Sequence, residues 1–202
     1  MNAASNLLNQ FLPEFHYHEI HQVLIRASAA CVFRAIHEVT PAELPAPVHF
    51  LFFLRSLPTR LLRRDRRGLN HSEPILKQIM AVSFVLLGEE LNCEVVLGII
   101  GKFWQATSDD PSKRKPAKDA REFMEFDKPG YAKAIMNFQV IEEDDHVVVR
   151  TETRIQALDE QARSKFRFYW RLILPGSALI RMLWLNAIKR RAEKSDAVVF
   201  QG

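Results

Sequence analysis

Three histidines near the N-terminus are the first residues whose type and spacing could do chemistry. His16, His18 and His21 form the pattern H-x-H-x-x-H, and imidazole nitrogens are common ligands of zinc. In a strand, His16 and His18 would share one face, whereas His21 would lie on the other. No neighbouring Cys or Asp completes a ligand set. We therefore expect solvent-facing histidines and no metal site.

The carboxylates give little sign of catalysis. Glu89 and Glu90 are adjacent, so in a strand they point to opposite faces and cannot work as a pair. Either one could be a general base if burial raised its pKa, but we favour two solvated residues near a turn. Asp127, before Pro129 and Gly130, is typical of a turn. With no triad signature, P-loop or G-x-G-x-x-G motif in the chain, we predict no catalytic residue and no cofactor, and we favour binding over catalysis.

Two clusters of basic residues stand out in the middle of the chain. The first comprises Arg60, Arg63, Arg64, Arg66 and Arg67, and the second comprises Lys113, Arg114, Lys115 and Lys118. The first follows an apolar segment, Val48–Leu62, which could lie on an anionic membrane or cover a cavity with a solvated basic rim. We favour the solvated rim. We expect no nucleic-acid partner, because exposed aromatic residues do not alternate with the basic ones.

Composition is that of an ordinary globular domain. The chain has 202 residues, 48% hydrophobic residues and a net charge of +4. We expect one domain over residues 1–202, with a loose segment or short helix at 1–14. No apolar run reaches the ~20 residues of a membrane span, and the N-terminus does not resemble a secretory signal. Cys31 and Cys93 fit reduced core cysteines of a cytoplasmic protein.

The longest periodic pattern lies in Asp159–Lys194. Asp159 is a favourable N-cap, and the apolar residues that follow recur at helical spacing. Pro175 predicts a kink. The stretch Ser177–Leu185 carries one charge, Arg181, and is apolar nearly all round. Such a helix should be covered nearly all round, so we predict a long kinked helix held in a concave sheet.

The preceding segments predict the sheet. His16–Ala27 alternates as a strand, and Ser28 should cap a short helix that ends near Ile36. A second helix is expected over Val48–Leu62 and a third over Ile75–Met80. Four more strands are expected at Phe84–Glu90, Cys93–Gln105, Tyr131–Ile141 and His146–Leu158. Helices segregated from an antiparallel sheet make an α+β fold. In the last two strands one face is apolar, and the other should meet water.

Four segments resemble a known family. They are EVVLGIIGKFW (Glu94–Trp104), FMEFDKPGYAKAIMNF (Phe123–Phe138), TETRI (Thr151–Ile155) and FYWRLILPGSALIR (Phe168–Arg181). With the strand and helix of Glu19–Ile36, they resemble the polyketide cyclase/START-like (SRPBCC) superfamily and, within it, an uncharacterised bacterial branch. The resemblance implies a helix-grip fold: a curved antiparallel sheet around the long C-terminal helix. It also implies a cavity between the two that holds an apolar or amphipathic ligand.

The predicted ligand-binding wall combines three strands and one helix. Its residues are Val95, Leu97, Ile99, Phe103, Ala134, Met136, Phe138, Thr151, Thr153, Ile155, Ile180, Trp184 and Ile188. Such a wall is mostly apolar, with two hydroxyls to orient a ligand, and its entrance is expected under Val48–Leu62. The same residues could instead interdigitate and leave no void. We predict binding of a lipid, an isoprenoid or an aromatic polyketide. The alternatives are a cyclase- or hydrolase-type enzyme and an interaction module with a collapsed cavity.

Overall fold

The computed structural model describes residues 7–45, 70–82, 84–105 and 117–199. Its centre is an antiparallel five-stranded sheet in the order β1-β5-β4-β3-β2. The strands are β1 (Tyr17–Ile25), β2 (Val85–Glu90), β3 (Glu94–Gly101), β4 (Ala132–Glu142) and β5 (Val147–Ala157). All five predicted strands are present. The third ends earlier than expected, at Gly101.

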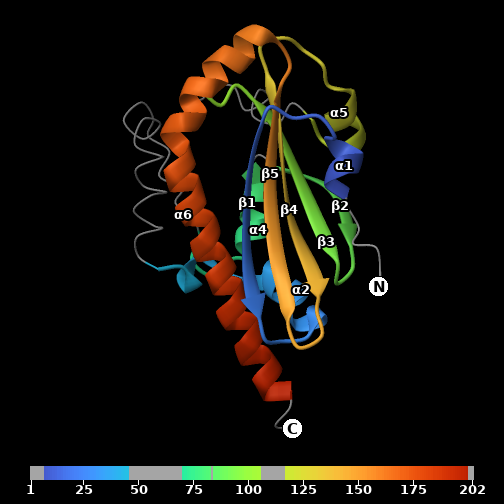
Figure 1. Ribbon diagram of the computed structural model, residues 1–202, viewed down its shortest axis with the longest axis vertical. Helices are drawn as coiled ribbons and strands as arrows, with labels where there is room; N and C mark the ends of the chain where they lie inside the picture. Colours follow the sequence, from blue (N-terminus) through green and yellow to red (C-terminus); the bar gives the residue numbers. More distant parts are fainter. Residues whose placement is uncertain (1–6, 46–69, 83, 106–116, 200–202) are drawn as a thin grey trace.

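Helices lie on both sides of this sheet (Figure 1). They are α1 (Leu7–Phe11), α2 (Ala29–Glu38), the 3-10 helix η1 (Pro41–Glu43), α4 (Ile75–Val82), α5 (Ala120–Glu125) and α6 (Glu160–Val199). The long α6 runs along one side, and α1 and α5 lie on the other. A curved antiparallel sheet with a long C-terminal helix across it is a helix-grip fold of the α+β class, as predicted.

The start of α6 is fixed by Asp159. Its carboxylate accepts hydrogen bonds from the backbone N–H groups of Ala162, at 2.7 Å, and of Gly130. Because these donors favour the charged form, they hold the pKa of Asp159 below its ordinary value. The helix then continues through Pro175 as one element of 40 residues, and its ribbon changes direction in the first third (Figure 1).

The main core lies between the sheet and α2, α4 and α6, on what we call the α6 side. Leu97, Phe138 and Val149 from three strands pack with Ile36 and Ile188 from α2 and α6. These are the apolar parities predicted from the sequence. The N-terminus of α2 differs from the prediction that Ser28 caps this helix. The Ser28 hydroxyl donates to Asp196 of α6 at 2.9 Å and makes no hydrogen bond within its own helix.

The other face of the sheet, the α1 side, does not meet water as the alternation predicted. A second core forms there from residues of β2, β3, β4, α1 and α5: Leu8, Leu12, Val85, Leu87, Val96, Ile100, Ala117, Phe123 and Ile135. The prediction was wrong because two short helices cover this face. One of them, α1, lies in the segment expected to be loose or a short helix, and both Leu8 within it and Leu12 just after it are buried.

Buried polar residues fasten α1 to this second core. Glu94 is fully buried, and its carboxylate accepts from the Leu7 backbone N–H at 3.0 Å and from the Asn137 side chain at 2.6 Å. Arg154 donates to Glu152 at 2.7 Å and to Asn9 of α1 at 2.6 Å. Because these buried charged groups each have a partner, the sheet can bury this face despite its charges.

The outward face of α6 contradicts the expectation of a helix covered nearly all round. Phe168, Leu172, Leu179 and Met182 are exposed on it. The expected helix Val48–Leu62, the Arg60–Arg67 cluster and Lys113–Lys115 lie outside the described residues.

Candidate functional site

A charged side chain lies in the middle of the α6 side. The guanidinium of Arg181 in α6 donates from Nη2 to the Thr153 hydroxyl of β5 at 3.1 Å and to the Met136 sulfur of β4 at 2.9 Å. Its carbon lies 5.9 Å from the ring centroids of both Phe138 and Trp184. Arg181 therefore points from the helix onto the sheet, into a wall that is otherwise mostly apolar.

Strand register places the sheet residues beneath Arg181. Leu97 of β3 pairs with Met136, Met136 with Thr153, and Thr153 with Glu19 of β1. Paired residues in neighbouring strands point to the same face. A row across four strands therefore ends in a carboxylate.

Glu19 and His21 share the inward face of β1. The Nε2 atom of His21 lies 2.7 Å from Glu19 Oε1, and the Glu19 side chain is only 7% exposed. The predicted wall, mostly apolar with two hydroxyls, therefore lies beside ionisable side chains of β1 that the sequence analysis did not include. We define the Arg181 site as Arg181, Glu19, His21, Thr153 and Met136.

Several polar atoms of this region are buried without a hydrogen-bond partner among the described residues. They are Nη1 of Arg181, Oε2 of Glu19 and the indole nitrogen of Trp184. Burial lowers the pKa of Arg181 to about 10, although the Glu19 charge opposes this effect. Arg181 is therefore still a cation at neutral pH, and buried groups of this kind are costly unless something pairs with them.

The surroundings of the Arg181 site are apolar at both ends. Toward the start of α6, Phe166 packs with Tyr17, Phe103, Trp104, Tyr169 and Trp170. Toward its end, Trp184 packs on Phe138 at 4.9 Å between ring centroids. Between them, the helix positions that face the sheet, Ile173, Ser177 and Ile180, are only half-buried. This middle band is less tightly covered than the core on either side.

The predicted ligand-binding residues all belong to the α6 side, but they differ in burial. Eight are buried: Val95, Leu97, Met136, Phe138, Thr151, Ile155, Trp184 and Ile188. Five are half-buried: Ile99, Phe103, Ala134, Thr153 and Ile180. Thr151 already donates its hydroxyl proton to the Asn137 carbonyl at 2.6 Å. The Thr153 hydroxyl accepts from Arg181 and can still donate its own proton. That these residues bind a ligand stays a prediction.

The three N-terminal histidines lie in different environments. His16 accepts from the Ala157 backbone N–H at 3.1 Å, and burial lowers its pKa. His18 is exposed, and His21 contacts Glu19. Within the described ranges, no group of three or more His, Cys, Asp or Glu side chains could hold a metal ion.

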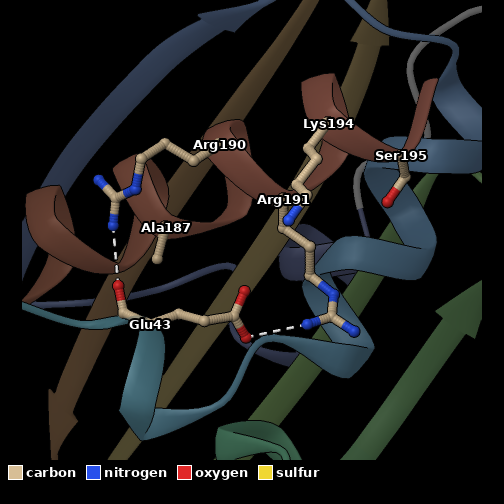
Figure 2. A pocket seen from close by; sticks show the side chains of 6 residues that line it. All are labelled: Glu43, Ala187, Arg190, Arg191, Lys194 and Ser195. Carbon is tan, nitrogen blue, oxygen red and sulfur yellow. Dashed lines mark hydrogen bonds and ion pairs between the residues drawn. The ribbon is translucent and has the colours of Figure 1, made fainter. Parts of the chain in front are cut away.

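A hollow of about 390 Å³ lies between η1 and the C-terminal half of α6 (Figure 2). Arg191 in it donates to Glu43 at 2.9 Å and to Glu38 at 3.0 Å, and Arg190 donates to the Glu43 carbonyl at 2.8 Å. Because these arginines already have partners, this hollow is a weaker candidate than the Arg181 site.

No protein-family model and no curated protein matches the chain. Among solved structures, a Mesorhizobium loti protein is similar at 10% identity and a TM-score of 0.43, over 89% of this chain and 99% of that one. A hypothetical protein from Helicobacter pylori is similar at 11% identity and a TM-score of 0.42, over 95% and 97%. The Zhui aromatase/cyclase from Streptomyces sp. R1128 has 11% identity and a TM-score of 0.28, over 88% and 94%. At these values none assigns a family or a function.

Proposed function

We propose that the protein binds a small amphipathic molecule between the sheet and α6, with the polar end of that molecule at Arg181. The observation that carries this proposal is the buried Nη1 of Arg181, which has no partner among the described residues. A bound acceptor atom would pair with it and offset the cost of burying the charge. The apolar body of the ligand would lie along the half-buried band toward Phe166.

The free atoms also limit the chemistry of the polar end. Arg181 Nη1 and Trp184 Nε1 are donors, whereas Glu19 Oε2 is an acceptor when charged. A carboxylate, sulfonate, carbonyl or hydroxyl oxygen suits the donors, and a hydroxyl can serve both kinds of atom. Lipid, isoprenoid and aromatic polyketide chemistry includes such molecules.

A second candidate is a cyclase- or hydrolase-type enzyme that uses the same region. The observation in its favour is the contact of 2.7 Å between His21 and Glu19, because a carboxylate that orients an imidazole is a common general-base arrangement. We rank it below binding, since no hydrogen bond joins His21 to a hydroxyl or thiol among the described residues; the partner of His21 there is Glu19.

The test is the affinity of Arg181→Met for two fluorescent probes. Anilinonaphthalene sulfonate carries an anionic group, whereas Nile red is neutral. A hydrogen bond to a charged group contributes about 1.5–3 kcal/mol, so the variant should lose about ten- to a hundredfold in affinity for the sulfonate probe. Its affinity for Nile red should change little.

The matched control is Arg167→Met, an exposed arginine of the same helix. It should bind both probes as the parent does, and near-ultraviolet circular dichroism should show that both variants keep their packing. An equal loss in the two variants, or none in either, contradicts the proposed role of Arg181. Native mass spectrometry of the purified parent should also reveal a copurified amphipathic molecule.

A further inference from the structure

The outward face of α6 carries a continuous apolar stripe. Phe168, Leu172, Leu179 and Met182 follow one another at helical spacing, with Pro175 between them. Phe168 is 77% exposed and Leu172 is 73% exposed. Scattered exposed apolar residues need no explanation, but an aligned series of large ones marks an interaction surface. We call these four residues the outer stripe.

The helix is apolar enough for lipid but is placed to lie on a membrane rather than to cross it. By length and composition α6 could span a bilayer, and only 22% of its most apolar window is buried. However, its inner face packs on the sheet and on α2 through Trp184 and Ile188. Arg181 on the same face donates a hydrogen bond to Thr153. The exposed apolar residues lie on its outer face, as in a helix that lies in the membrane interface.

The charged residues around the outer stripe indicate what kind of partner would bind there. The turns before the outer stripe carry exposed Arg163, Lys165 and Arg167, and exposed Arg171 lies between its first two residues. The turns after the stripe carry exposed Arg190 and Lys194. Glu160 is the acidic residue of the first turn. A second copy of the chain would bring basic ends opposite basic ends in either orientation, which disfavours a symmetric dimer through this face. The complementary partner is apolar and anionic.

We propose that the outer stripe is a docking surface for an anionic lipid bilayer. The four apolar side chains would enter the acyl boundary, and the arginines and lysines at both ends would lie among anionic headgroups. The surface is separate from the Arg181 site, which lies on the opposite face of the same helix. This inference therefore goes beyond ligand binding and does not depend on it.

The experiment is cosedimentation of the full chain with lipid vesicles. The protein should sediment together with vesicles of phosphatidylcholine and phosphatidylglycerol. Vesicles of phosphatidylcholine alone should do so less, and high salt should weaken binding to the anionic vesicles. The double variant Phe168→Gln/Leu172→Gln should lose at least about tenfold in partitioning, because the apolar contacts that hold the helix in the boundary are removed.

The matched control is Leu91→Gln, since Leu91 is 74% exposed in the turn between β2 and β3, away from α6. It should sediment as the parent does. A second variant, Arg167→Gln/Arg171→Gln, should lose the preference for anionic vesicles while circular dichroism stays unchanged. The proposal is overturned if the parent does not sediment, or if the stripe variant sediments as well as the parent. It is also overturned if light scattering shows a dimer that the stripe variant breaks without any vesicle binding.

Discussion

Trp184 is the residue where the Arg181 site meets the main core. It is 6% exposed, packs against Phe138 and lies beside the Arg181 guanidinium. Truncation of such a side chain removes apolar contacts and leaves a cavity that the surroundings fill only in part.

Trp184→Ala should therefore lower the free energy of unfolding by about 3–5 kcal/mol. Urea unfolding followed by far-ultraviolet circular dichroism measures this change. A midpoint equal to that of the parent would show that Trp184 is not part of the core.

At this scale the sequence predicted the apolar wall but missed its charges. The alternation over β1 that puts Tyr17 and Val23 on one face also puts Glu19 and His21 on that face, so the signal was present in the sequence. Arg181 was visible as the one charge in an apolar stretch, but its wheel position alone does not say that its guanidinium reaches Thr153. That contact depends on how the helix lies across the sheet, which no local pattern encodes.

Among the elements, α1 depends on a buried carboxylate. Burial raises the pKa of Glu94 above its ordinary value, although hydrogen bonds from Asn137 and Leu7 oppose the shift. In the folded protein Glu94 therefore holds its proton at a pH at which the unfolded chain has released it. Its contribution to stability is full below the unfolded pKa, about 4.3, and is lost as pH rises through the folded pKa.

Glu94→Gln removes this titration and tests the assignment. As pH rises above about 4.3, the parent should lose stability relative to the variant. Urea midpoints of both proteins, measured at a series of pH values, give the difference, in which the other titrating groups largely cancel. Parallel curves for the two proteins would show that Glu94 titrates normally in the folded state.

Long elements were predictable from their periodicity, whereas the two shortest α-helices were not. The alternation in β4 and β5 and the helical spacing in α6 extend over 11, 11 and 40 residues, so chance agreement is small. In contrast, α1 has five residues and α5 has six, too few for a periodic pattern. These two helices cover the α1 side, and the sequence analysis did not predict that either packs on the sheet, so the prediction that this face meets water was wrong.

For the whole molecule, the two cores share one sheet. Consecutive residues of β3 show how closely they are joined, because Val95 and Leu97 belong to the main core and Val96 between them belongs to the second core. Unfolding of either core would disrupt the shared sheet and so expose the sheet residues of the other core. Such coupling favours a single unfolding transition.

We therefore expect one cooperative unfolding transition over the domain. Tryptophan fluorescence reports on the α6 side, and far-ultraviolet circular dichroism reports on all elements, so their urea curves should coincide. Separate midpoints would mean that the two cores form independent units and that the chain is not one cooperative domain.

The pairing of β1 with β5 has a consequence for the order in which the strands can pair during synthesis. The first strand of the chain lies next to the last, and the Ala157 N–H reaches His16 across 141 residues. The meander from β2 to β5 can form from neighbouring segments, but β1 has no adjacent strand until β5 has been synthesised. Closing so long a loop is slow. During synthesis, β1 is therefore the segment that waits longest for its partner and the one most open to association with other chains.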